Sequence, residues 1–284
     1  MKPKHLLALG VLAAIHTGHA HPPTQDYIDA GRFTDGIEGP AFGPDGRLYV
    51  PNLKTQGTIG VVSAQGQADI FMRLPEGSIG NAIRFNAEGD MLVADYTGHN
   101  VHVIDLESRA IRHTYHQPAM HQPNDIAVSR SGMIYASDPD WSTDSGQLWR
   151  ISPEGEIVLL ECGMGTTNGI ELSPDETRLY VNESVQRKVW VYDVSPEGDI
   201  SNKQLFHQFD DYGLDGMKTD RTGNLYIARY GAGRITVLSP EGEVINRFPL
   251  QGQHPTNLAL KENESTRVYV TLQQRGAIET FTVE

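Results

Sequence analysis

The sequence has very little cysteine. Cys162 is the only one among 284 residues, so no intrachain disulfide can form and the fold must be held together by its core. This residue lies between Glu161 and Gly163 and follows an apolar stretch at 157–160, so we expect a buried, inert thiol. Thiol catalysis and a disulfide scaffold are therefore both disfavoured.

Positive charge is also scarce. The chain has 23 Lys and Arg residues against 36 Asp and Glu residues, which gives a formal net charge of −13. Nucleic acids and anionic membrane surfaces are bound by clustered Lys and Arg, so we expect neither as a partner. An acidic chain is compatible with cation binding.

Long apolar runs are absent after the beginning of the chain. Lys2 and Lys4 precede an apolar run at 6–15, and residues 18–20 (Gly-His-Ala) fit a signal-peptidase site. The run falls well short of the roughly 20 residues that span a bilayer, so residues 1–20 are predicted to be a secretory signal cleaved after Ala20. The mature chain, 21–284, is then one domain exported to a periplasm or to the outside, with no membrane attachment after cleavage.

One short motif recurs along the whole chain. It reads Gly-x-Leu-Tyr-Val or a variant, and its centres, 43 to 46 residues apart, are Tyr49, Leu92, Tyr135, Tyr180, Tyr226 and Tyr269. This spacing fits a four-stranded propeller blade. In the first copy, alternating segments at 39–42, 47–51, 58–63 and 68–71 are separated by turns or loops, which predicts four antiparallel strands. Six copies therefore predict an all-β fold, a six-bladed β-propeller.

The sixth copy is one strand short of a full blade. It ends after the segment 277–283, and an incomplete blade would leave a sheet edge open at the seam of the ring. We therefore predict that residues near 27–33 pair with the last blade as its outer strand. The alternative is a disordered leader.

An oxygen-bearing side chain stands 11 or 12 residues before each motif centre. The six residues are Glu38, Asn81, Asn124, Asn168, Asp215 and Asn257. Because the first strand of every blade lines the channel, they are expected to form a ring around one axis. Asparagine alone could simply favour the start of a strand, but two carboxylates facing a narrow channel repel unless a cation or a proton compensates them.

The ring therefore predicts a site for one divalent cation. Carboxylate and amide oxygens suit a hard cation, and calcium takes 6 to 8 oxygen ligands in flexible geometry. Zinc would prefer nitrogen or sulfur ligands. We expect Ca²⁺ in the first place, with Zn²⁺, Mg²⁺ and Mn²⁺ as alternatives.

Several ordered motifs around this ring are typical of one protein family. They are residues 38–40 (Glu-Gly-Pro), 123–126 (Pro-Asn-Asp-Ile), 168–170 (Asn-Gly-Ile), 215–217 (Asp-Gly-Met) and 255–257 (Pro-Thr-Asn). With them the chain resembles the SMP-30, gluconolactonase and luciferin-regenerating family of calcium-dependent propellers over nearly all of the mature sequence.

The resemblance implies a metal-dependent hydrolase of a small lactone or related ester. The implied metal ligands are Glu38, Asn124, Asn168 and Asp215. Asn81 and Asn257 would lie behind these ligands or reach the metal through water. The metal would polarise the lactone carbonyl, while Asp215 activates water or attacks directly, so Asp215 is the expected catalytic residue.

One departure from the family concerns the substrate. Sugar-lactone hydrolases of this family often carry arginine two residues before Asn124, and this chain has Gln122 there, which weakens the expected hold on a polyhydroxy or anionic substrate. Other side chains expected on the same rim, where they could orient substrate or shuttle a proton, are His121, His254, Trp141, Tyr230, Tyr96, His99, Asp138 and Tyr212. For any single one, an ordinary surface-loop role is the favoured interpretation.

Two further functions stay open at this stage. A binding propeller of the NHL type uses similar blades but needs no channel carboxylates, so Glu38 and Asp215 distinguish it from an enzyme. An arylesterase or phosphotriesterase would use the same ring, and only substrate profiling separates it from a lactonase. A Ser-His-Asp hydrolase is disfavoured because the sequence has no Gly-x-Ser-x-Gly motif.

Overall fold

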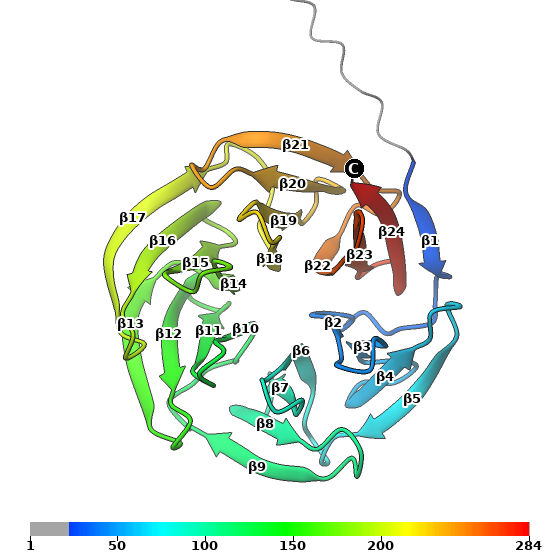
Figure 1. The fold of residues 1–284 in the computed structure, drawn as a ribbon, viewed down its shortest axis with the longest axis horizontal. Helices are drawn as coiled ribbons and strands as arrows, with labels where there is room; N and C mark the ends of the chain where they lie inside the picture. The colour runs from blue at the N-terminus through cyan, green and yellow to red at the C-terminus, as the bar shows by residue number, and fades with distance from the viewer. Residues whose placement is uncertain (1–22, 284) are drawn as a thin grey trace, which may run out of the picture.

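Six four-stranded antiparallel sheets surround a central channel in the computed structural model, which describes residues 23–283 (Figure 1). The predicted all-β fold, a six-bladed β-propeller with four-stranded antiparallel blades, is confirmed. No described residue is helical, so this part of the chain has no helix of the kind that crosses a bilayer. The predicted signal, residues 1–20, lies outside the described residues.

The blades follow one another in chain order, and in five of them the first strand is innermost (Figure 1). The first blade is β2 (Ala41–Phe42), β3 (Leu48–Pro51), β4 (Thr58–Val62) and β5 (Ala68–Arg73). The second is β6 (Gly80–Phe85), β7 (Met91–Asp95), β8 (Asn100–Ile104) and β9 (Ile111–His116). The third is β10 (Ile126–Val128), β11 (Ile134–Asp140), β12 (Ser145–Ile151) and β13 (Ile157–Met164).

The remaining three blades repeat this order, except at the seam. The fourth is β14 (Thr167–Leu172), β15 (Arg178–Glu183), β16 (Lys188–Val194) and β17 (Ile200–Gln208). The fifth is β18 (Met217–Thr219), β19 (Leu225–Arg229), β20 (Arg234–Leu238) and β21 (Val244–Pro249). The sixth is β22 (Pro255–Glu262), β23 (Thr266–Leu272), β24 (Ala277–Val283) and, outermost, β1 (Gln25–Ile28).

The N-terminal strand closes the ring, as predicted. β1 pairs antiparallel with β24, and Asp26 forms an ion pair with Arg275 at 2.7 Å. The Tyr27 hydroxyl donates to the carbonyl oxygen of Ser63 in the first blade at 2.6 Å, which ties the two sides of the seam together. The regular strand ends at Ile28, but Gly31 N still donates to the carbonyl oxygen of Arg275, and Arg32 N and Phe33 N donate to that of Gly276, in the last blade. Phe33 also forms a bridge with Leu53 of the first blade.

The apolar cores lie between neighbouring blades. Every motif centre is buried on the second strand of its blade, where Tyr49, for example, contacts Phe71 of its own blade and Phe85 of the next one. Blades that each bury one face against the next are stable only as a ring, because no blade encloses a core alone.

The expectation of a buried Cys162 is wrong. Cys162 is exposed on β13, the outermost strand of the third blade. The apolar stretch before it suggested burial, but an outer strand has no further strand beyond it and its side chains alternate between the next blade and solvent. Leu159 on the same strand is exposed as well, because an irregularity in the pairing with β12 adds a residue between Leu159 and Glu161 and brings positions 159 and 162 to the same face.

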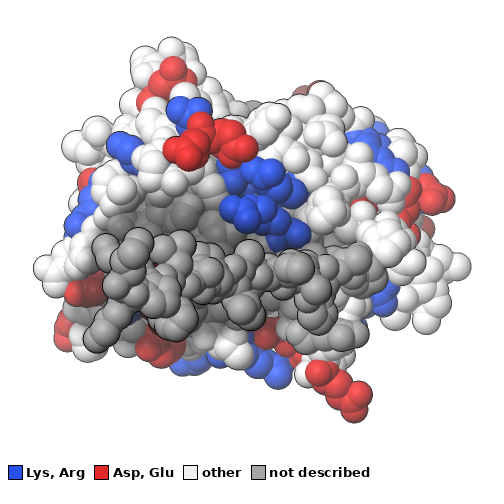
Figure 2. Space-filling view, turned by 90° about the horizontal axis from the view of Figure 1, so that it is seen from above, with Lys and Arg blue, Asp and Glu red and all other residues white. Residues whose placement is uncertain are grey.

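Charges of both signs are spread over the side of the molecule drawn in Figure 2. The basic side chains visible there lie beside acidic ones, and no broad area of one sign covers the part that the figure colours. The strongest concentration of charge that concerns function lies inside the channel instead.

Candidate functional site

A cleft of about 390 Å³ opens on one face of the propeller at the end of the channel. Two sets of residues line it. One set stands at the beginnings of the inner strands: Glu38, Asn81, Asn124, Asn168 and Asp215. The other set comes from loops between second and third strands: Gln56, Tyr96, Trp141, Ser184, Tyr230 and Gln273. These two kinds of loop share one face of the ring, as the blade pattern predicts.

Asn257, the sixth member of the predicted ring, does not line the cleft. It is 2% exposed, and its Nδ2 donates to Asp125 Oδ2 at 3.2 Å, further along the channel. The neighbouring Thr256 takes its place in the cleft wall. Asn257 also lies so close to Gly216 that a Cβ at this glycine would be 1.9 Å from the Asn257 side chain, so residue 216 must be glycine.

The backbones of the ring residues are fixed by hydrogen bonds between blades. The Asn81 side chain donates to the carbonyl oxygen of Asn124 at 3.0 Å, and Gly39 N donates to the carbonyl oxygen of Asn81 at 2.8 Å. Asn182 Nδ2 donates to the carbonyl oxygen of Asp215 at 2.6 Å. The ring is therefore preorganised by contacts that do not use the oxygens facing the cleft.

Three oxygens of the ring lack hydrogen-bond partners although they are buried: Glu38 Oε2, Asn168 Oδ1 and Asp215 Oδ1. Buried polar atoms are almost always paired, so three orphans on one cleft call for an explanation. All three are hard oxygen acceptors, and a cation bound among them would satisfy them together. The residues present thus fit a divalent cation.

The pKa values of the two ring carboxyls also fit a bound cation. Burial, and after it the charges of Asp215 and Asp125, raise the pKa of Glu38 well above its ordinary value. Burial and then Asp125 raise the pKa of Asp215, while hydrogen bonds from Asn168 and Gly216 N oppose the shift. Neither carboxylate forms an ion pair with a described Lys or Arg. Two close carboxylates without a cationic partner are costly when both are ionised.

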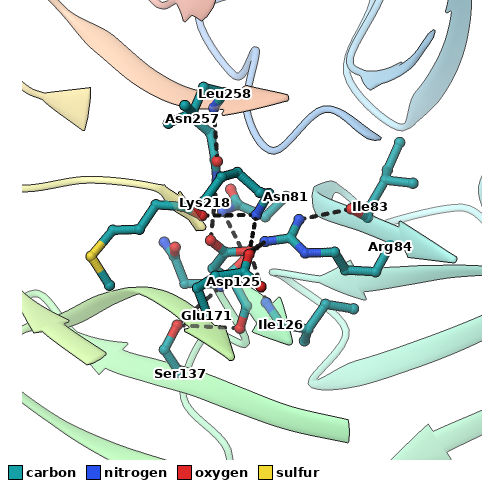
Figure 3. A network of polar contacts seen from close by, with 12 residues as sticks. Asn81, Ile83, Arg84, Asp125, Ile126, Ser137, Glu171, Lys218, Asn257 and Leu258 are labelled. Carbon is teal, nitrogen blue, oxygen red and sulfur yellow. Dashed lines mark hydrogen bonds and ion pairs between the residues drawn. The ribbon is translucent and has the colours of Figure 1, made fainter. Parts of the chain in front are cut away.

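A second group of charges, shown in Figure 3, lies further along the inner strands. Arg84 Nη2 contacts Asp125 Oδ1 at 2.7 Å, and Lys218 Nζ contacts Glu171 Oε2 at 2.9 Å. Arg84 also lies 3.9 Å from Glu171, so the four residues form one network, which we call the channel network. Asp125 is fully buried, and burial, followed by the charge of Arg84, lowers the pKa of Lys218.

The channel network was not predicted from the sequence, although the spacing of its residues contains a signal. Arg84, Glu171 and Lys218 each stand three residues after a ring residue, in the second, fourth and fifth blades. Strict alternation along a strand would put such residues on opposite faces. Irregular pairing near the starts of β6 and β14 adds a residue at this point, so positions three apart can share the channel.

The predicted rim residues fall into different places. Trp141, Tyr230 and Tyr96 line the cleft, whereas His121, Gln122 and His99 line a neighbouring hollow. His254 packs edge-on against Tyr230 with ring centres 4.7 Å apart, and it lines neither space. Asp138 is fully buried in a structural role, and Tyr212 is 54% exposed outside the cleft lining.

The sequence can be compared with families of known proteins. The model of the family described as SMP-30/Gluconolactonase/LRE-like region matches residues 38–274. The chain belongs to this family. The match begins at Glu38 and spans all the other ring residues up to Asn257, so the whole candidate site lies within the family region.

Two characterised relatives cover most of this chain. A gluconolactonase from Zymomonas mobilis is 28% identical over 251 residues, 81% of this chain, which spans only 57% of that relative. A pentonolactonase from Haloferax volcanii is 26% identical over 238 residues, 82% of this chain and 80% of the relative.

The fold is shared with solved structures of the family. That of a gluconolactonase from Xanthomonas campestris aligns with a TM-score of 0.78 over 92% of this chain and 89% of that one, at 19% identity. This likeness supports the same propeller architecture.

Proposed function

We propose that this protein hydrolyses a small neutral lactone at the ring cleft with the help of one divalent cation. The observation that carries the proposal is the group of three unpartnered, buried oxygens on Glu38, Asn168 and Asp215. The similarity to a gluconolactonase and a pentonolactonase supports a lactone as the substrate.

The proposed ligands are Glu38, Asn124, Asn168 and Asp215, which all line the cleft. Their oxygens suit Ca²⁺, with Mg²⁺, Mn²⁺ and Zn²⁺ as alternatives to test. Within the described residues, no three His, Cys, Asp and Glu side chains gather into a metal site, so the amide oxygens are essential to this one. When bound, the cation would polarise the lactone carbonyl and stabilise the negative charge that develops on its oxygen.

Asp215 is the proposed catalytic residue. The Asp215 carboxylate is buried, the backbone carbonyl of this residue is fixed by Asn182 Nδ2 at 2.6 Å, and its Oδ1 has no partner in the protein. This oxygen can take a proton from water, which then adds to the carbonyl carbon, or it can attack that carbon itself. In the first route the ring C–O ester bond breaks, the ring oxygen takes the proton held by Asp215, and a hydroxy acid leaves. In the second route the ring C–O bond breaks as an acyl-Asp215 anhydride forms and the ring oxygen takes a proton from water; a water molecule then cleaves the anhydride, which releases the hydroxy acid and restores the carboxylate.

The remaining side chains of the cleft would hold the substrate. Tyr230 donates from its hydroxyl to Gln273 at 2.5 Å, and burial, then the charges of Asp215 and Glu38, raise its pKa so that it stays a neutral donor. Trp141 is 39% exposed and offers an apolar face to a ring. We further propose that residues 1–20 direct export, which would place this reaction in a periplasm or outside the cell.

The direct test uses the mature chain, 21–284, beside the variant Asp215→Asn. Elemental analysis would measure bound metal, and a panel of sugar, aliphatic and aromatic lactones, an aryl ester and a phosphotriester would define the reaction. We expect one cation per chain, with lactone turnover that is lost on chelation and in the variant.

A matched control is Asp210→Asn, because Asp210 is exposed and lies outside the cleft lining. It should keep both metal and turnover. A metal-bearing protein without turnover on any substrate would mean a binding propeller, and a protein that never binds metal would contradict the proposed site.

A further inference from the structure

A second hollow adjoins the ring cleft between the second and third blades. Its volume is about 610 Å³, and we call it the side lobe. It shares the walls Tyr96 and Trp141 with the ring cleft. Its other principal residues are His99, His121, Gln122, Asp140 and Ser142. A monosaccharide lactone seated over the ring oxygens would leave this adjoining space unfilled.

The side lobe has a fixed frame. The buried carboxylate of Asp138 accepts hydrogen bonds from His121 N at 2.8 Å and from Gln122 N at 2.6 Å. The same carboxylate accepts bonds from Gln147 Nε2 at 2.7 Å and Trp149 Nε1 at 2.9 Å, so it fastens one wall of the lobe to the third blade. A hollow whose wall is held from behind in this way is preformed.

The charges of the lining exclude an anionic ligand. No lysine or arginine lines either the ring cleft or the side lobe in the described part of the chain. The ring cleft contains Asp35, Glu38 and Asp215, and the lobe contains Asp140. A bound cation would offset two of these charges and still leave no positive site in the lobe. The group that fills the lobe is therefore not an anion.

The polar atoms of the lining exclude a purely apolar group. Four polar side chains, those of His99, His121, Gln122 and Asp140, line the lobe. His99 Nδ1 has no partner in the protein, whereas Asp140 Oδ1 accepts hydrogen bonds from Ser142 N and Oγ at 3.0 and 2.6 Å. An aliphatic or aryl tail would displace water from these groups without offering them hydrogen bonds in its place. The ligand must therefore carry several hydroxyl groups or similar partners.

Two aromatic side chains form part of the wall of the side lobe. Trp141 is exposed, and with Tyr96 it presents apolar ring surface beside these polar groups. A pyranose ring matches both features, because it has an apolar C–H face and a rim of hydroxyl groups.

We propose that the side lobe binds a glycosyl unit attached to the lactone ring, so that the substrate is the lactone of a disaccharide aldonic acid. This inference rests on the proposed lactonase function. The reaction is unchanged: water adds to the carbonyl carbon, the ring ester bond breaks, its oxygen gains a proton, and the glycosidic bond stays intact.

The test compares glucono-1,5-lactone with cellobiono-1,5-lactone, in the wild type and in the variant Ser142→Trp. Ser142 is exposed, lines the lobe and does not line the ring cleft, so a tryptophan there would take up space in the lobe. The variant also removes the bond that Ser142 Oγ donates to Asp140 Oδ1 at 2.6 Å. Ser201→Trp, at an exposed position on β17, is the matched control.

We expect kcat/KM of the wild type to be about tenfold higher for the disaccharide lactone, a difference worth about 1.4 kcal/mol. Ser142→Trp should remove this preference and leave the monosaccharide lactone within about twofold, whereas Ser201→Trp should change neither. Equal turnover of both lactones, unaffected by Ser142→Trp, would overturn the inference and leave the lactonase function standing.

A binding measurement separates the two proposals if neither lactone is hydrolysed. Saturation-transfer NMR with methyl β-cellobioside needs no catalysis, and it should give a signal with the wild type that is lost in Ser142→Trp. That result would support the side lobe while the proposed lactonase function failed. Absence of the signal in the wild type would overturn the side lobe as a glycosyl site.

Discussion

Replacing Asp215 with asparagine should stabilise the metal-free protein at neutral pH while it abolishes cation binding. In the wild type, burial and the nearby charges raise the pKa of both Glu38 and Asp215. Each carboxyl therefore holds its proton more tightly in the folded state than in the unfolded one. The variant keeps the shape of the side chain and removes one of the two charges.

The sign of the pH dependence follows from this. A carboxyl with a raised pKa contributes stability that is fully present below its unfolded pKa and is lost as pH rises through its folded value. Each such group contributes a slope of about −1.4 kcal/mol per pH unit within that window. As pH rises from about 4.5, the free energy of unfolding of the wild type should therefore fall relative to that of Asp215→Asn.

Cation binding should offset the lower stability of the wild type. A ligand at 100 times its Kd adds about 2.7 kcal/mol to the free energy of unfolding if it binds only the folded state. Calcium at that excess should stabilise the wild type by this amount at pH 8 and leave Asp215→Asn unchanged.

Urea unfolding in EDTA and in calcium, at steps between pH 4.5 and 8.5, measures all of these quantities. Asp210→Asn serves as the control, because Asp210 is exposed and lies outside the cleft lining. A metal-free wild type that is as stable as Asp215→Asn at every pH, or more stable, would refute the reasoning.

Two further predictions concern the channel network and the seam of the ring. Arg84→Met leaves the buried Asp125 without its cation and should lower the free energy of unfolding by about 3–5 kcal/mol. Arg221→Met, which removes an exposed pair with Glu262, should cost at most about 1 kcal/mol in the same urea titration; equal losses would contradict a role for burial. Deleting residues 21–28 removes β1, including the buried Ile28, and should cost at least about 2 kcal/mol and promote aggregation along the edge of β24. An unchanged melting temperature and a monodisperse protein would show that β1 does not stabilise the ring.

Most of the fold could be predicted because the blade is a repeat. The motif centred on Tyr49 recurs with nearly constant spacing, and each copy places an aromatic or apolar side chain between two blades. Ring closure by the N-terminal segment followed from counting strands. The end of the regular strand was harder to predict, because Phe33 still donates a backbone hydrogen bond to the last blade while it packs beside Leu53 of the first blade.

The site was predictable up to the orientation of individual side chains. Repeat phase placed Glu38 and Asp215 on one cleft, since equivalent positions on inner strands converge on the axis. The position of Asn257 within its repeat does not predict that its side chain turns toward Asp125. This orientation depends on a hydrogen bond to a residue 132 positions away in the sequence. The apolar run before Cys162 misled for a similar reason: burial on an outer strand depends on the neighbouring blade.

The charges of the channel explain why one divalent cation suits it. In the channel network, Asp125 and Glu171 face Arg84 and Lys218, so two negative charges meet two positive ones. The carboxylates of Glu38 and Asp215 have no such partner among the described residues, which leaves the ring with a charge of −2 when both are ionised. A cation of charge +2 would neutralise this remainder. The channel network is thus electrically neutral overall. The uncompensated negative charge lies on Glu38 and Asp215, where the substrate carbonyl would be polarised.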